Sequence, residues 1–300
     1  MASATHSAMA PITSKISINA GEMIVSNVCK SYGTGLFEKK VVKDCSFNVE
    51  RGKLTVMIGP SGCGKSTLIK LLAGFEKPTS GNILLNGKPV TGPGRDRLVV
   101  FQESALFPWM TSYDNIMYGP IARGEDDKKA RDLAEFLLDK VGLRDFRGKY
   151  PMQLSGGMQR RAELARAMIN NPEVMILDEP FRGLDAMSKE LMWEYYAKLF
   201  EESHRTNFFV TTDIDEAVYL ADRLLIMTNT PMQVRAVIDV DIPRPRSLSS
   251  FFTSDRANDV KMQALSLLHE EAMKSFSGGS KAAADFVEAY SKRKNATTTP

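Results

Sequence analysis

The sequence predicts an α/β protein built around a mostly parallel β-sheet that is covered on both faces. A glycine-rich stretch at residues 59–67 lies between the β-rich run 53–58 and the apolar helical run 68–73. Further along the chain, strand-like runs alternate with helical stretches, which is the pattern of parallel sheets. These later strand-like runs lie at residues 174–178, 207–211 and 223–227.

Two runs near the start of the chain, at residues 23–30 and 41–49, alternate apolar and polar side chains. Half-buried antiparallel strands show this alternation. Tyr32 and a glycine-containing turn lie between the two runs, where the aromatic ring either stacks on a base or remains a surface tyrosine. A further strand and turn are expected at residues 83–87.

A short buried strand is expected at residues 98–101, ending at Gln102, and the pattern then changes. Residues 128–141 carry apolar side chains at helical spacing, and no strand-like run interrupts this part of the chain. We therefore expect a helical subdomain, inserted at about residues 103–165. Later helices are expected at residues 154–170, 186–203 and 215–221.

The length of 300 residues and the hydrophobic content of 43% are enough for one large domain with appendages. We expect a disordered tail at residues 1–20, a main domain at 21–243 and a C-terminal extension at 244–300. The extension is expected to hold an amphipathic helix at 258–276, a linker at 277–280 and a polar appendage after it.

The composition argues against several classes of protein. The net charge of +3 gives no argument for nucleic acid binding, which uses a concentrated basic face. No run approaches the roughly 18 apolar residues that cross a bilayer, and the N-terminus lacks the charged and apolar regions of a secretory signal. Cys29, Cys45 and Cys63 are scattered, which indicates reduced thiols in a cytosolic protein and no metal-ligand spacing.

The glycine-rich stretch reads GPSGCGKST and matches the phosphate-binding loop G-x-x-x-x-G-K-[ST]. Its glycines allow the backbone N–H groups to converge on a phosphate at the positive end of the following helix. Lys65 is placed to reach the β- and γ-phosphates, and the Ser66 hydroxyl to bind Mg²⁺. A glycine-rich turn without a ligand is the alternative, which the flanking strand and helix disfavour.

Two further motifs belong to a nucleotide site. The apolar run 174–177 ends in Asp178 and Glu179, where Asp178 can reach Mg²⁺ and Glu179 can polarise an attacking water. Residues 154–159 read LSGGMQ and open a helix whose free N–H groups can meet an anion. A plain helix-start turn is the alternative for this second motif.

With these motifs in place, the chain resembles the ATPase subunits of ABC transporters over residues 23–242. The matching pieces are GPSGCGKST, Gln102 after a strand, LSGGMQRRAELARA, VMILDEP, GLDA around Asp185, and the region T-x-D-I-D-E-A. The resemblance implies a P-loop NTPase core with an antiparallel β subdomain and an inserted α-helical subdomain. Residues 105–109 (ALFPW) and 114–116 (DNI) resemble the importer branch for nitrate, sulfonate, taurine and bicarbonate.

The resemblance implies ATP and Mg²⁺ as ligands, with each ATP held between the phosphate loop of one chain and the LSGG segment of a second. The residues it assigns to ATP binding are Tyr32, Ser61, Gly62, Cys63, Gly64, Lys65, Ser66, Thr67, Ser155, Gly156, Gly157, Gln159 and Asp185. The residues it assigns to Mg²⁺ are Ser66, Gln102 and Asp178, and those it assigns to hydrolysis are Glu179, Gln102 and Thr212. A monomeric P-loop kinase is the alternative, but it has no use for LSGGMQ.

The resemblance also implies partners. A second ABC ATPase subunit completes the site, as a homodimer or a heterodimer, and transmembrane permease subunits dock beside Gln102. Phe107, Pro108 and Trp109 suit an exposed anchor for the permease, or else they pack the helical subdomain. A periplasmic or extracellular solute-binding protein selects the solute, no nucleic acid is involved, and the chain lies peripherally on the cytoplasmic face of the inner membrane.

Thr212 departs from the family pattern, because residues 210–213 read VTTD where relatives have V-T-H-D. A threonine hydroxyl is shorter than an imidazole and carries no positive charge. We therefore expect ATP binding to survive and turnover to fall by roughly 10²–10³. Three explanations stand: a heterodimer whose other subunit carries the histidine, a slow homodimer, or an engineered substitution.

Two smaller departures concern Arg182 and Cys63. Arg182 occupies a position where relatives commonly have a small residue, and we expect a surface charge. Cys63 lies inside the phosphate loop, where a helix N-terminus lowers a thiol pKa, unless the loop simply tolerates it.

Two other functions are alternatives to solute import. A soluble ABC ATPase of DNA repair or translation carries long coiled-coil insertions or two cassettes, and this sequence has neither. An ATP-gated scaffold with little turnover stays open because of Thr212.

Overall fold

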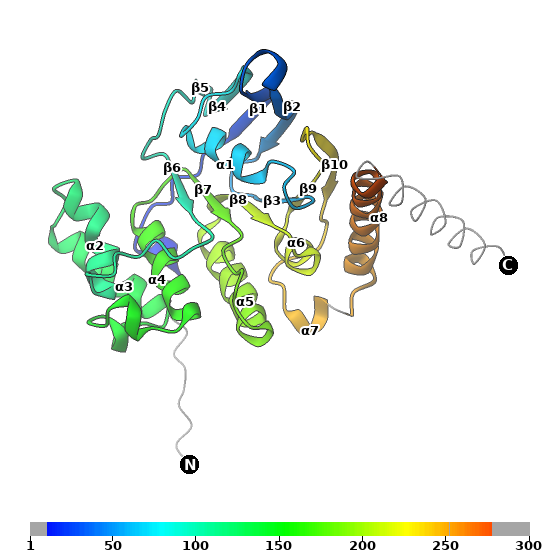
Figure 1. Cartoon of the computed structure of the whole chain (residues 1–300). Helices are drawn as coiled ribbons and strands as arrows, with labels where there is room; N and C mark the ends of the chain where they lie inside the picture. The colour runs from blue at the N-terminus through cyan, green and yellow to red at the C-terminus, as the bar shows by residue number, and fades with distance from the viewer. Residues whose placement is uncertain (1–10, 252, 278–300) are drawn as a thin grey trace.

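The structure, a computed structural model, describes residues 11–251 and 253–277. Its centre is a six-stranded sheet in the order β10-β9-β3-β8-β7-β6 (Figure 1). These strands are β3 (Leu54–Ile58), β6 (Arg97–Val100), β7 (Val174–Asp178), β8 (Thr206–Thr211), β9 (Arg223–Met227) and β10 (Val234–Asp239). Neighbouring strands are parallel except β10, which runs antiparallel to β9. The predicted mostly parallel α/β sheet is confirmed, although β10 was not anticipated.

A second sheet is antiparallel and has the order β2-β1-β4-β5. Its strands are β1 (Met23–Tyr32), β2 (Lys39–Val49), β4 (Ser80–Leu85) and the two-residue β5 (Lys88–Pro89). β1 pairs with β2 on one side and with β4 on the other. In Figure 1 this sheet lies above the central one. The antiparallel strands expected from the alternating runs are therefore present.

The helices of the described residues are α1 (Lys65–Ala73), α2 (Ser112–Ala122), α3 (Lys128–Lys140), α4 (Gly156–Ile169), α5 (Ala186–Ser203), α6 (Ile214–Leu220), α7 (Leu248–Phe251) and α8 (Asp255–Ser277). Short 3-10 helices lie at Ile12–Ser14, Gly35–Phe37, Arg144–Phe146 and Pro151–Gln153. α2 and α3 form the helical subdomain between β6 and β7, packed on α4 (Figure 1). Thr111 and Asp114 begin α2 with a reciprocal capping box, a start signal that the sequence analysis missed.

The central strand β3 is buried along its whole length. Leu54, Val56 and Ile58 belong to the core that includes residues of α5 and α6, whereas Met57 belongs to the core shared with α1 and the antiparallel sheet. A strand covered on both faces needs mainly apolar side chains on both, and every residue of β3 except the buried Thr55 is apolar. This burial fixes the position of the loop that follows β3.

The prediction of a disordered tail is wrong for residues 11–20. Ile12 is fully buried in the core beside α5, and the Gly21 N–H donates to the Glu173 carbonyl at 2.9 Å. The Asn19 N–H also donates to the Asn171 side chain at 3.3 Å. Three isoleucines spread among polar residues are a weak sequence signal, but here Ile12 is buried in the core and Ile16 and Ile18 pack against it. Residues 1–10 lie outside the described residues.

The predicted C-terminal helix is present as α8, which packs against α6 and β9 (Figure 1). Arg235 of β10 pairs with Glu270 of α8 at 3.0 Å, and the Asn229 N–H donates to the buried Glu271 at 3.2 Å. The polar appendage and nearly all of the linker expected before it fall at residues 278–300, outside the described part. Within the described part, every helix is too short or too polar to cross a bilayer.

Candidate functional site

The glycine-rich loop connects the carboxyl end of β3 to the first residue of α1, Lys65. Gly64 precedes the helix with φ of +120°, and a Cβ there would meet a Val41 side-chain carbon at 3.0 Å. Glycine is therefore required at this position. Thr230 donates its hydroxyl to the Gly62 carbonyl at 3.0 Å, so a second loop holds the first from outside.

Lys65 is buried although it is charged, with 8% of its surface exposed. Its Nζ donates to the carbonyls of Gly59 and Pro60, each at 3.1 Å. Buried ammonium groups need such acceptors. The carbonyls hold the Lys65 ammonium inside the bend of the loop, where it faces the cavity described next.

A cavity of 350 Å³ opens above this loop. It is lined by Lys39, Val41, Ser61, Gly62, Gly64, Lys65, Ser66, Thr67, Gln102, Asp178, Glu179, Arg182 and Thr230. The loop follows β3, Gln102 follows β6, and Asp178 ends β7, so the carboxyl ends of three parallel strands meet here. Ligands of open parallel sheets bind at this edge. The sequence analysis missed Lys39, Val41 and Thr230, which carry no motif of their own.

The two acidic residues differ in their surroundings. Burial and the neighbouring Glu179 raise the pKa of Asp178, while Lys65 and Arg182 oppose that rise. Glu179 is 7% exposed and has φ of +41°, a backbone angle that non-glycine residues seldom adopt. Its N–H donates to the Val210 carbonyl of β8 at 2.8 Å, which holds the residue in this conformation. The main chain of Glu179 is thereby fixed, and its side chain lines the cavity.

Arg182 lies in the cavity, so the expectation of a simple surface charge was incomplete. Its side chain is 61% exposed, and its Nη1 donates to Glu179 Oε2 at 3.1 Å. The same nitrogen lies 3.4 Å from Gln102 Oε1. Arg182 therefore bridges two residues that the sequence analysis assigned to hydrolysis.

α4 holds the backbone of Gln102 in place. Arg160 donates from Nη1 to the Phe101 carbonyl at 2.8 Å and from Nη2 to the Gln102 carbonyl at 2.6 Å. Glu163 accepts from Arg160 at 2.6 Å, and both side chains are buried. The main chain of Gln102 is thus fixed, and its side chain lines the cavity, where Oε1 meets Arg182.

The LSGG segment and Asp185 stand outside the set of described residues that line the cavity. Ser155 caps α4 by accepting from the Met158 N–H at 3.3 Å, and Gln159 donates to the carbonyl oxygens of Pro151 and Leu154. Asp185 caps α5, where its hydrogen bonds with Ser188 lower its pKa. Within one chain these residues support helix starts.

Tyr32 is 39% exposed and also stands outside the described lining residues. Its hydroxyl donates to Glu76 at 2.6 Å, and Lys30 Nζ lies 5.0 Å from the ring centroid. Burial, followed by the bond to Glu76, raises the pKa of Tyr32. The Lys30 ammonium therefore already occupies one face of the Tyr32 ring.

Of the two alternatives for Cys63, the structure favours a loop that simply tolerates the residue over a reactive thiol. The side chain is 1% exposed, and Sγ lies 4.0 Å from Met232 Sδ. Burial raises the pKa of the thiol, although Lys65 acts in the opposite direction. The thiol points into the core, so only the backbone of Cys63 can take part in the phosphate loop.

Thr212 is exposed and is absent from the described residues that line the cavity. The next residue, Asp213, caps α6 and pairs with Lys189 of α5 at 2.6 Å. The Thr212 segment is thus tied to α5, and its short side chain stays at the surface.

Phe107, Pro108 and Trp109 do not behave alike. Phe107 is half-buried, with its ring 4.6 Å from Tyr118 and 5.4 Å from the Arg166 guanidinium, which fits the alternative that it packs the helical subdomain. Trp109 is 69% exposed. A groove of 480 Å³ runs beside them, between β6 and the helices α2 and α4. Phe107 and Glu163 both line it.

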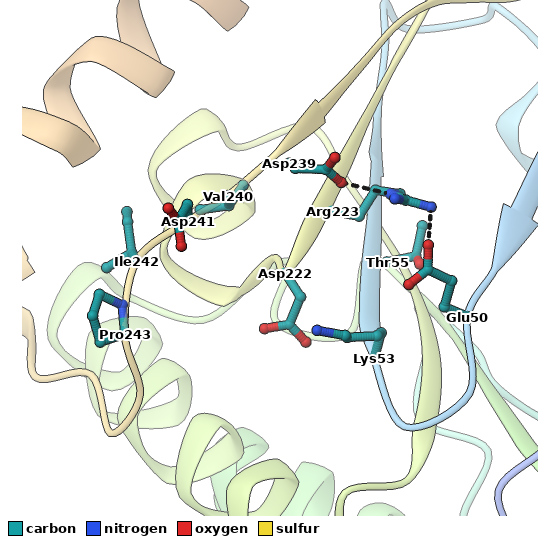
Figure 2. Close-up of a pocket in the computed structure, with 10 residues that line it drawn as sticks. All are labelled: Glu50, Lys53, Thr55, Asp222, Arg223, Asp239, Val240, Asp241, Ile242 and Pro243. Atoms are coloured by element: carbon teal, nitrogen blue, oxygen red, sulfur yellow. Dashed lines mark hydrogen bonds and ion pairs between the residues drawn. The ribbon is translucent and has the colours of Figure 1, made fainter.

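Figure 2 shows a second, larger cavity of 550 Å³ at the opposite edge of the sheet, by the amino ends of β3 and β9. Arg223 pairs there with Asp239 at 2.8 Å and also with Glu50. Asp222 accepts from the Leu54 N–H at 2.8 Å and from Arg244 at 2.9 Å. This cavity lies at the amino ends of the strands, whereas the phosphate loop lies at their carboxyl ends, so the two are separate. Among the described residues, no cluster of His, Cys, Asp and Glu has the arrangement of a metal site.

Comparison with known proteins gives consistent matches. The model of a family described as ABC transporter matches residues 42–182. The chain is 39% identical over 255 residues to the nitrate import ATP-binding protein NrtD of Synechococcus elongatus, covering 84% of this chain and 93% of that protein. It is 41% identical over 221 residues to the aliphatic sulfonates import ATP-binding protein SsuB of Bacillus licheniformis, covering 74% and 86%.

A solved structure gives the same answer for the fold. The dimeric post-hydrolysis state of an ATP-binding cassette bound to ADP and Pi superposes with a TM-score of 0.64 and 29% identity. The match covers 74% of this chain and 100% of that cassette. The identities and coverage are high enough to decide the family.

Proposed function

The chain belongs to the ABC transporter family, and we propose that it is the ATP-hydrolysing subunit that powers solute import through a membrane-embedded permease. The solute class would be that of the nitrate, sulfonate, taurine or bicarbonate branch. The observation that carries the proposal is the convergence of the phosphate loop, Gln102, Asp178 and Glu179 on one cavity. These groups come from segments far apart in the sequence, at the ends of three strands.

Each residue has a role that its position supports. Lys65 and the N–H groups of the loop bind the phosphates, and Ser66 and Asp178 are the residues that would hold Mg²⁺. When bound, Mg²⁺ neutralises phosphate charge. Glu179 accepts a proton from the attacking water, whose oxygen bonds to the γ-phosphorus as the bond to the β-bridging oxygen breaks. ADP and phosphate are the products.

The test of nucleotide binding is a comparison of MgATP affinity in the parent and in Lys65→Ala, measured by calorimetry on the full chain. Loss of one charge-assisted contact is expected to weaken binding at least about tenfold. Lys198→Ala, an exposed lysine on α5 outside the cavity lining, is the matched control. Equal MgATP affinities for the parent and Lys65→Ala would reject the proposed site.

The second half of the site is proposed to come from another ATPase subunit. Ser155 and Asp185 each cap a helix of their own chain, and the N–H groups at the start of α4 remain available to a phosphate. Paired Ser61→Cys and Ser155→Cys chains should crosslink between copies when ATP is present. If they crosslink equally without ATP, nucleotide-dependent closure is rejected.

We propose that turnover at this chain's own site is impaired by Thr212. An exposed threonine cannot place a donor on developing phosphate charge at the cavity. Thr212→His should raise the ATPase rate of the purified chain by about 10² or more. No gain from the histidine would show that this position does not limit turnover. The hypothesis of a heterodimer whose other ATPase subunit carries the histidine would then lose its support.

The permease is proposed to dock in the groove beside β6, with Trp109 as its exposed anchor. Docking there would place the chain peripherally on the cytoplasmic face of the membrane. Trp109→Ala should weaken co-purification with the permease while MgATP affinity stays unchanged. Unchanged co-purification would exclude Trp109 as an anchor.

A further inference from the structure

Three cationic side chains line the nucleotide cavity among the described residues: Lys39, Lys65 and Arg182. Lys65 is held by the carbonyls of its own loop, and Lys39 lies at the start of β2. Arg182 alone of the three contacts Glu179 and Gln102, at 3.1 and 3.4 Å. A guanidinium therefore lies beside Glu179 and Gln102, two of the residues assigned to hydrolysis.

The base of this side chain is fixed, while the side chain itself is largely exposed. The preceding residue, Phe181, is fully buried, with its ring 5.9 Å from Tyr196 and 5.8 Å from Phe209. Gly183 follows with φ of +83°, which turns the chain away toward α5. A buried anchor before the arginine and a turn after it aim the side chain at the cavity, although 61% of it remains exposed.

A guanidinium has five N–H donors and can bind two anionic groups at once. Only Nη1 is engaged with Glu179 and Gln102, so other donors remain for a second anion. The segment of Thr212, in contrast, places no cation among the described lining residues. The cavity thus has one flexible cation beside the candidate base.

We propose that Arg182 binds the γ-phosphate of ATP within its own chain while it keeps its contact with Glu179. This inference rests on the proposed ATPase function. Arg182 would then supply the positive charge that Thr212 lacks, and it would distinguish ATP from ADP, because only ATP has a γ-phosphate. The carboxylate and the γ-phosphate would share one cation, which lowers their mutual repulsion.

The test measures the affinity of the full chain, with Mg²⁺, for the non-hydrolysable analogue AMP-PNP and for ADP. Arg182→Gln should weaken AMP-PNP binding about tenfold, the size of one charge-assisted hydrogen bond. ADP binding should change by less than about twofold. Arg182→Lys should recover part of the AMP-PNP affinity, because it restores the charge without the planar fork.

Arg131→Gln is the matched control, since Arg131 is an exposed arginine that pairs with Asp126 at 2.8 Å in the helical subdomain. Equal losses for AMP-PNP and ADP in Arg182→Gln, or no loss for either, would overturn the role of Arg182. Failure of the parent chain to bind either nucleotide would instead overturn the proposed function. The two failures are therefore distinct.

Discussion

Glu216 lies in the helix that follows Thr212 and gives a quantitative test of the structure there. It lies in the first turn of α6, is 2% exposed, and accepts a hydrogen bond from Trp193 Nε1 at 2.6 Å. Burial raises its pKa to about 7, although Thr211, Lys189 and Trp193 act in the opposite direction. The charge of Asp213 adds to the rise.

The sign of the pH effect follows from these values. In the unfolded chain the carboxyl loses its proton near 4.5, whereas in the folded chain it keeps the proton up to about 7. Between these values the folded state binds more protons, so stability falls as the pH rises through this window and levels off above it. The difference between the two pKa values corresponds to a loss of about 3 kcal/mol.

Glu216→Gln removes this titration while it leaves an oxygen for the Trp193 N–H. The variant and the parent are expected to have similar unfolding free energies near pH 5. At pH 8 the variant should be more stable, by up to about 3 kcal/mol. Urea unfolding of both proteins at several pH values between 5 and 8 measures the difference between their unfolding free energies. Ionisable groups that both proteins share contribute equally to each and cancel in this difference.

The same substitution at an exposed glutamate of α5, Glu190→Gln, is the matched control. A difference for Glu216→Gln that stays constant across this range would refute the reasoning. A variant less stable than the parent at pH 8 would refute it as well, and would show that the charged carboxylate is stabilised by Lys189 and Trp193 more than burial disfavours it.

Three further predictions concern the folded core and its edges. Ile12→Ala should lower the free energy of unfolding by about 2–5 kcal/mol in urea; no loss would mean that residues 11–20 contribute nothing to the core. Cys63 should react with a thiol reagent far more slowly than the half-buried Cys29, as followed by peptide mass spectrometry, and comparable rates would contradict its burial. Glu271→Ala should remove the acceptor of the Asn229 N–H and lower the free energy of unfolding by about 1–3 kcal/mol. The amide hydrogens of α8 should then exchange faster. Unchanged exchange would show that this contact does not hold the helix.

The parts of the fold that follow from local sequence were predictable. A buried central strand such as β7 is a continuous apolar run because both faces are covered, and Asp178 ends it where the carboxylate must leave the core. The helix α5 matches its expected range, 186–203, since it runs from a capping Asp185 to a left-handed His204. These signals lie within a few residues of the element that they define.

The rest depended on contacts between distant segments. β10 alternates half-buried and exposed residues, because it lies at the edge of the sheet and pairs only with β9 in the described part. Arg182 meets Gln102 across 80 positions of sequence, so a lone charge gave no sign of the cavity. In the sequence, Cys63 lies just before a helix N-terminus, a position that can make a thiol reactive. The fold nevertheless turns its thiol toward Met232.

The charges of the cavity explain why a cation belongs beside Glu179. In the complex proposed above, ATP would bring its γ-phosphate to a wall that already carries Asp178 and Glu179. Two unit charges 4 Å apart repel by about 4 kcal/mol at an effective dielectric constant of 20, which is comparable to the energy of a few charge-assisted hydrogen bonds. A cation between carboxylate and phosphate removes most of this repulsion without displacing either group. With threonine at position 212, the guanidinium of Arg182 is the group whose geometry meets that requirement.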